Sequence, residues 1–141
     1  MSSLIVESSD RGVEPGLPAD TSDLVAFLSF AVAERYGSVH ALSAAANLLR
    51  KRQKIDLRPL LEFDNAEPDD DLDRQTLARL WQAPAPVAAA ATAVASAIRS
   101  DPQLASLTAD FPALPALLHE LAAVADTAAA RGVQIRLTYR L

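Results

Sequence analysis

Between residues 21 and 131, apolar side chains recur every three or four positions, the spacing that gathers them on one side of an α-helix. Thr21 or Ser22 can cap a first helix, which we expect to continue to Tyr36 and to end at Gly37. Apolar residues surround this first helix almost completely. It should therefore lie at the centre of the core or be half-covered by another subunit.

The same spacing predicts the elements that follow. We expect a second helix that starts at Ser38 and runs to residue 53, a short helical turn at 57–63, an acidic loop at 62–73 and a helix at 73–82. The side chains expected on the buried side of this last helix are Leu72, Leu77, Leu80 and Trp81.

Three more helix signals follow in the second half of the chain. Alanine, the strongest helix former, dominates residues 86–99. Asp101 should cap a short helix at 102–107, and Asp110 should cap a longer one that ends at Gly132.

After Gly132 the apolar spacing changes from the helical period to strict alternation, which predicts a β-strand at 133–141. A single strand leaves backbone groups unpaired, so it needs a partner from residues 3–7 or from another chain. The fold class we expect is mainly α: an irregular bundle of five to six helices with a C-terminal β-strand, paired with a short N-terminal strand or with a second chain. Residues 1–20 should be a flexible segment before a single helical domain at 21–141.

Composition narrows the class of protein. The chain has 141 residues, half of them apolar but only 5% aromatic, so one domain should form a core with few large side chains. It has no cysteine, no basic leader, and no apolar run longer than about ten residues, half of what a bilayer span requires. We therefore expect a cytoplasmic protein without a membrane segment. The net charge of -5 disfavours non-specific binding to nucleic acid.

No motif predicts catalysis, a metal or a cofactor. His40 and His119 lack a second ligand at metal-binding spacing, and the chain has no glycine-rich phosphate loop. The alternating aspartates that begin at Asp69 resemble the first half of a calcium loop, but Arg74 and Leu80 stand where that loop needs glycine and glutamate. We expect no specific metal, no cofactor and no enzymatic activity.

One basic cluster follows the second predicted helix and consists of Arg50, Lys51, Arg52, Lys54 and Arg58. Three interpretations are open. The cluster can be neutralised by the acidic loop at 62–73, bind an acidic or protein partner, or contact DNA, since residues 22–58 resemble a helix-turn-helix in outline.

We therefore expect a non-catalytic protein–protein interaction or assembly module, such as an adaptor subunit, that self-associates. The alternative is a DNA-binding regulator that uses residues 22–58. The apolar first helix and the strand without a partner favour self-association. The residues expected at the contact between copies are Phe27, Phe30, Val133, Ile135, Leu137 and Tyr139.

Overall fold

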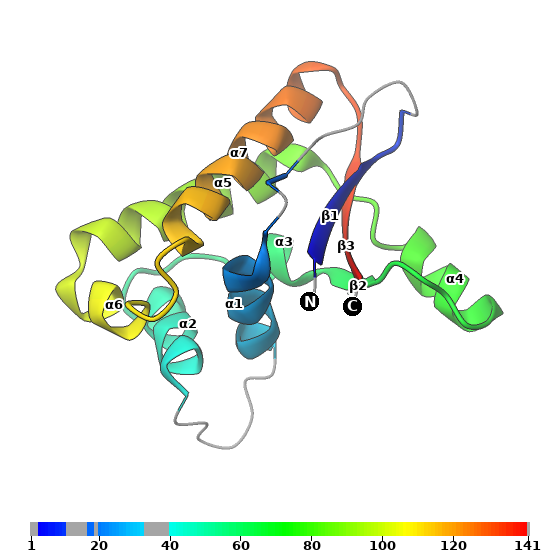
Figure 1. Ribbon diagram of the computed structural model, residues 1–141. Coiled ribbons are helices and arrows are strands. Elements are labelled where there is room, and N and C mark those ends of the chain that lie inside the picture. Colours follow the sequence, from blue (N-terminus) through cyan, green and yellow to red (C-terminus); the bar gives the residue numbers. More distant parts are fainter. Residues whose placement is uncertain (1–2, 11–16, 19, 33–39, 141) are drawn as a thin grey trace.

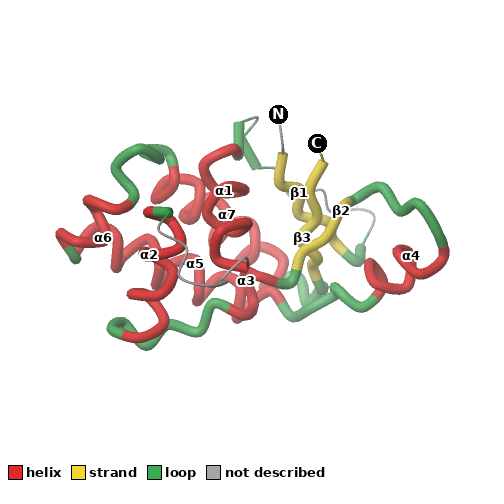
Figure 2. The backbone as a smooth tube through the Cα atoms, turned by 90° about the horizontal axis from the view of Figure 1, so that it is seen from below, coloured by secondary structure: helices red, strands yellow, loops and turns green. Residues whose placement is uncertain are grey.

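The computed structural model describes residues 3–10, 17–18, 20–32 and 40–140. Helices predominate, and a small sheet lies at one side of them (Figures 1 and 2). The elements are β1 (Ser3–Ser8), α1 (Ser22–Val32), α2 (Ala41–Lys51), α3 (Arg58–Leu61), β2 (Phe63–Asn65), α4 (Asp71–Ala78), α5 (Pro84–Ser100), α6 (Pro102–Leu107), α7 (Leu114–Ala130) and β3 (Ile135–Arg140). Within the described ranges, none of these helices is long and apolar enough to cross a membrane.

Helix α1 lies in the core, as one of the two interpretations of its apolar surface predicted. Leu24, Phe27 and Leu28 are completely buried. The helix packs against α2, α3, α7 and β1 of the same chain. Its apolar surface is therefore covered largely from within the chain. The predicted stop at Gly37 lies outside the described residues.

Helices α5 and α7 form the most extensive contact between helices, and they run side by side in Figure 1. Both contribute buried alanines to the core: Ala88, Ala90, Ala91, Ala95 and Ala97 from α5, and Ala122, Ala125 and Ala128 from α7. Because the distance between packed helices depends on the side chains at their contact, alanines allow the two helices to approach closely. A core with few aromatic residues can be filled in this way.

Capping residues set several helix boundaries. Asp101 caps α6 as expected, because its carboxylate accepts a hydrogen bond from the backbone N–H of Gln103 at 2.9 Å. Gly132 follows α7 with a φ of 69°, which glycine adopts without strain. Helix α2 is capped by His40, whose Nδ1 accepts a hydrogen bond from the backbone N–H of Leu42. The expected cap of α2, Ser38, is outside the described residues.

The prediction that Asp110 caps the long helix is wrong. Residues 108–110 and 112–113 form turns, and α7 begins only at Leu114. At the start of α7, the backbone N–H of Ala113 donates instead to the carboxylate of Asp23 in α1, at 2.9 Å. A side chain distant in sequence therefore binds the start of this helix.

Helix α4 also differs from expectation. Asp70 accepts a hydrogen bond from the backbone N–H of Asp73, so the helix starts at Asp71 and not at residue 73. Leu77 is buried, but Leu72, which was predicted to be buried, is 68% exposed. Leu72 lies in the first turn of a helix that stands away from the helical body in both views of the backbone (Figures 1 and 2).

The sheet has the strand order β1-β3-β2, which makes β3 its central strand. Strand β1 pairs with β3 in the antiparallel direction, with Val6 opposite Leu137, as the internal alternative predicted. On the other edge, β2 pairs with β3 in parallel, and Gln82 forms a further bridge to Ile135. Of the two partners expected for β3, the N-terminal strand is therefore the one observed, and the other edge of β3 is also paired within the chain.

The missed strand is β2, which was expected to be part of a helical turn and an acidic loop. It has three residues, too few to show a clear alternation of apolar and polar positions. The alternation in β3 itself holds in part: Ile135 and Leu137 are completely buried, whereas Tyr139 is half-buried. Thr138, on the opposite face, is completely buried as well.

We predict that Ile135→Pro prevents the chain from folding. The substitution removes the N–H that donates to the carbonyl of Gln82 at 3.0 Å, and it also removes a buried side chain. The combined loss should be at least about 3 kcal/mol, a large part of the stability of a typical domain. The matched control, Ile135→Val, should cost only about 1 kcal/mol. Thermal unfolding followed by circular dichroism measures both, and a cooperative transition near that of wild type for the proline variant would contradict the central position of β3.

Candidate interaction surfaces

The predicted basic cluster does not form one free positive surface. Arg52 forms an ion pair with Asp101, and Arg58 forms one with Asp56 at 2.9 Å. Arg50 donates to the backbone carbonyl of Ala31 at 2.9 Å. Each of the three arginines of the cluster thus has a partner within the chain.

Asp101 joins three elements at the end of α2. Its carboxylate accepts hydrogen bonds from Arg52 and Gln53, which follow α2, and from the first turn of α6. Its own N–H donates to the carbonyl of Ala97 in α5. Burial raises the pKa of Asp101, but the hydrogen bonds from Arg52, Gln103 and Gln53 outweigh burial, so the pKa lies below the usual 3.8. Asp101 therefore favours its charged form in the fold.

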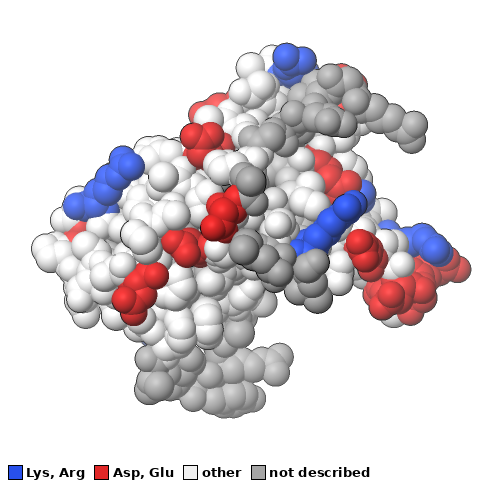
Figure 3. Space-filling model, viewed as in Figure 1, with Lys and Arg blue, Asp and Glu red and all other residues white. Residues whose placement is uncertain are grey.

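Asp56 neutralises Arg58 in a similar way on the surface. Hydrogen bonds from the side chain and the backbone N–H of Arg58 lower the pKa of Asp56 to about 2. Both ion pairs thus use aspartates outside the acidic loop at 62–73. Helices α2 and α4 lie on opposite sides of the molecule in both backbone views, and acidic side chains gather over α4 in Figure 3. The interpretation that these two charge blocks neutralise each other is therefore not supported by the geometry.

A second polar site lies on the sheet and is called here the Arg136 cluster: Glu7, Trp81, Arg136 and Thr138. The Arg136 guanidinium donates to both carboxylate oxygens of Glu7, at 3.0 and 3.2 Å, and lies 4.5 Å from the centre of the Trp81 ring. It also donates to the carbonyl of Leu77, and Thr138 donates to Glu7. Each polar group has a partner within the chain, so the cluster ties β1, β3 and the end of α4 together.

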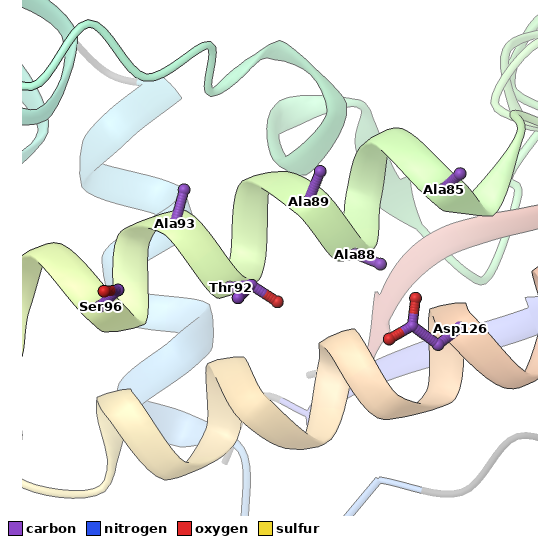
Figure 4. Close-up of a pocket in the computed structure, with 7 residues that line it drawn as sticks. All are labelled: Ala85, Ala88, Ala89, Thr92, Ala93, Ser96 and Asp126. Carbon is purple, nitrogen blue, oxygen red and sulfur yellow. The ribbon is translucent and has the colours of Figure 1, made fainter.

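The third feature is a groove along α5, with a volume of about 480 Å³ (Figure 4). It is called here the α5–α7 groove and is lined by Ala85, Ala88, Ala89, Thr92, Ala93, Ser96 and Asp126. The last residue comes from α7 and lies near Ala88 and Ala85, with its carboxylate turned towards α5. Asp126 is the one ionisable side chain in this lining.

The face of α5 at this groove carries no charge. The chain has no charged residue from Pro84 to Ile98, although Ala85, Ala89, Thr92 and Ser96 are exposed. Most exposed helix faces in soluble proteins carry charged or polar residues. The alanine bias was visible in the sequence, but only the packing of α5 shows which of its alanines face outwards.

Other candidate residues have structural roles. His40 stacks on Phe30, with ring centres 3.6 Å apart, and His119 is exposed. Asp70 caps α4, and Asp71 pairs with Arg74. Over the residues that the structure describes, no three His, Asp or Glu side chains are arranged to hold a metal ion.

The side chains predicted to contact a second copy belong to the chain's own core or its border. Phe27, Ile135 and Leu137 are completely buried. The remaining three, Phe30, Val133 and Tyr139, are half-buried or packed against that core, and Tyr139 contacts Phe63 edge to face. Phe27, Ile135 and Leu137 are therefore covered by the chain itself, whereas Phe30, Val133 and Tyr139 keep part of their surface exposed.

Comparison of the chain with protein-family models, with curated proteins and with solved structures found no match.

We predict that Asp101→Asn destabilises the protein at neutral pH but not in strong acid. Because the pKa of Asp101 is lowered on folding, its charge stabilises the fold above pH 3.8, and this contribution is lost as the pH falls below that value. Asparagine can still cap α6 through one oxygen, but its NH2 group replaces the oxygen that accepts from Arg52 and Gln53, so the variant removes the charge together with these two hydrogen bonds. The melting temperature should fall by a few degrees at pH 7, and the difference from wild type should vanish in strong acid. Asp110→Asn, at an exposed aspartate, is the control, and an equal effect of both variants would contradict the role of Asp101.

We also predict that Arg136→Ala loosens the end of α4 and costs about 1–2 kcal/mol, because it removes a partly exposed ion pair and several charged hydrogen bonds. Trp81 is the only tryptophan in the chain, so its fluorescence reports this site alone. The emission should shift to longer wavelength in the folded variant as the guanidinium leaves the ring. Arg140→Ala, at an exposed position of the same strand, should change neither the emission nor the stability. An unchanged emission in Arg136→Ala would show that the contact with Trp81 is absent in solution.

Proposed function

We propose that this chain is a non-catalytic protein–protein interaction module that binds through the α5–α7 groove. The observation that carries the proposal is the exposed, uncharged face of α5, whose small side chains form the wall of a groove. Such a face leaves methyl groups and neutral hydroxyls in contact with water. A partner that covers them gains from apolar burial without removing charges from water.

The lining favours a helix over a small molecule as the occupant. Small-molecule sites are concave and commonly combine hydrophobic or aromatic walls with several converging polar groups. The α5–α7 groove has no aromatic side chain, and Asp126 is its one ionisable group. Side chains as small as alanine, serine and threonine let a partner helix approach α5 closely, in the range of about 8 to 10 Å between axes. The same lining offers no pair of groups for acid–base or nucleophilic chemistry.

The proposed surface differs from the residues of α1 and β3 that the sequence favoured. The strand β3 is paired on both edges and α1 is in the core, so neither supports binding of another chain. The face of α5 replaces them as the surface for an assembly or adaptor role, including self-association.

The helix-turn-helix alternative gains no support from the described part of residues 22–58. A recognition helix presents exposed polar side chains to base edges, often from its N-terminal part. In α2, every residue from Ala41 to Arg50 is buried or half-buried, and the first exposed side chain is Lys51. Arg52 and Arg58 are already paired with aspartates.

We predict that a photo-crosslinking residue at position 89 captures a protein partner, because Ala89 is an exposed residue of the groove wall. The same crosslinker at Ala130, exposed on α7 outside the lining, is the control. Capture from position 89 should be lost when Thr92→Arg places a charge in the groove. Equal capture from both positions, or capture unaffected by Thr92→Arg, would contradict the proposed surface. A mobility shift of duplex DNA that weakens with salt would favour the DNA-binding alternative.

A further inference from the structure

The exposed residues of α5 follow a spacing that suits a helix pair. Ala85, Ala89, Thr92, Ser96 and Arg99 are all exposed and are separated by four, three, four and three positions. This alternation averages 3.5 residues, the period that keeps one seam of a helix against a partner helix. The seam extends along most of a 17-residue helix, or about 25 Å. It is thus long enough for one continuous helix–helix contact.

We infer that the partner of the α5–α7 groove is a second copy of this chain, whose α5 packs antiparallel against the first about a two-fold axis near Thr92. This inference rests on the proposed function. A two-fold axis places the same surface of both copies in contact. Because the seam consists of small residues around its centre, each α5 can enter the groove of the other. Position 89 then lies at the level of position 95 of the second copy, next to position 96 on the same seam.

Charge complementarity supports this partner and this direction. Within the described part of the chain, neither Arg99 nor Asp126 has an ion pair or a hydrogen bond from its side chain. Arg99 lies seven positions after Thr92, and Ala85 lies seven positions before it. The two-fold axis therefore places Arg99 of one copy beside Ala85 of the other, and Asp126 lies at that end of the groove.

The antiparallel arrangement thus pairs each Arg99 with the Asp126 of the other copy. A parallel arrangement would instead place Arg99 beside Arg99 of the other copy, and like charges across an interface disfavour binding. Arg99 and Asp126 thus gain a partner in the antiparallel arrangement but not in the parallel one. Each copy contributes one residue to each ion pair.

Cysteine crosslinking tests the arrangement, because the natural chain has no cysteine. Thr92→Cys should form a disulfide between two copies on mild oxidation, and Ala130→Cys should not. A mixture of Ala89→Cys and Ser96→Cys should give mainly the mixed dimer, since these positions lie at nearly the same level on the two seams and disulfides require Cα atoms less than about 7 Å apart. A dominant dimer between two Ala89→Cys chains would overturn the antiparallel direction.

Charge reversal tests the ion pairs. In sedimentation equilibrium at tens of micromolar and low salt, wild type should have twice the 15.0 kDa chain mass. Arg99→Asp and Asp126→Arg should each weaken the dimer about tenfold, and the double variant should recover most of the affinity. Among the described residues neither side chain has a partner, so Asp126→Arg should change the melting temperature of the monomer little. Arg99→Asp also places a negative charge in the last turn of α5, which should lower the melting temperature slightly. Single variants without effect, or no recovery in the double variant, would overturn the pairing.

The mass of wild type and the crosslinking from position 89 together distinguish a failure of the dimer from a failure of the groove as a binding surface. A strictly monomeric wild type would overturn the inference. If that monomer is crosslinked from position 89 to a different protein, and Thr92→Arg abolishes the crosslink, the groove still binds a partner. A monomer that captures nothing from position 89 would overturn both.

Discussion

The pairing of β3 on both of its edges is the constraint on which the arrangement of the chain depends. One edge holds β1, and the other holds Gln82 and β2, so three distant segments are fixed by one strand. Leu4, Val6, Ile135 and Leu137 are all buried in the same hydrophobic core as the helices. Arg136 and Thr138 bind Glu7, and Arg136 also binds the end of α4. The sheet thus fixes the region around α4 as well as the border of the core.

The remainder of the core depends on small side chains. Phe27 is the largest fully buried residue, and most of the space between α5 and α7 is filled by alanine and leucine. Interiors packed in this way have little room for added volume, since extra methylene groups in a close-packed core cost about 1–3 kcal/mol. The same helix α5 carries alanines on its exposed side. One helix therefore contributes buried alanines to the core and an uncharged face to the surface.

Most helix positions could be predicted from the sequence, because they depend on capping residues and apolar spacing that act over a few positions. Asp101, Gly132 and the apolar spacing act over a few residues, and the structure confirms the elements that they mark. Contacts between residues far apart in the sequence could not be predicted. The hydrogen bond from Ala113 to Asp23 joins residues 90 positions apart, and the Arg52–Asp101 pair joins residues 49 positions apart. The expected neutralisation of the basic cluster by the acidic loop failed for the same reason, because closeness in sequence did not place α2 beside α4.

The candidate site was even less predictable. The alternation in β3 correctly indicated a strand. The sequence of a strand does not show which segments pair with its two edges. The second partner, β2, has only three residues and was too short to predict. The apolar residues of α1 and β3 suggested an exposed contact surface, but most of them lie in the core or at its border. The face of α5 was overlooked because alanine is equally suited to the inside and to the outside of a helix, so its composition does not show which side remains uncovered.

The register of β1 against β3 also limits the order in which the protein can be completed during synthesis. Ser3 pairs with Arg140, so β1 leaves the ribosome long before its partner exists. Helices α1 to α7 are all made in that interval, and contacts local in sequence form faster than those between distant segments. Strand β1 can therefore reach its place in the sheet only after residues 135–140 have emerged. Until then Leu4 and Val6, which are buried in the finished fold, lack the strand that they pair with.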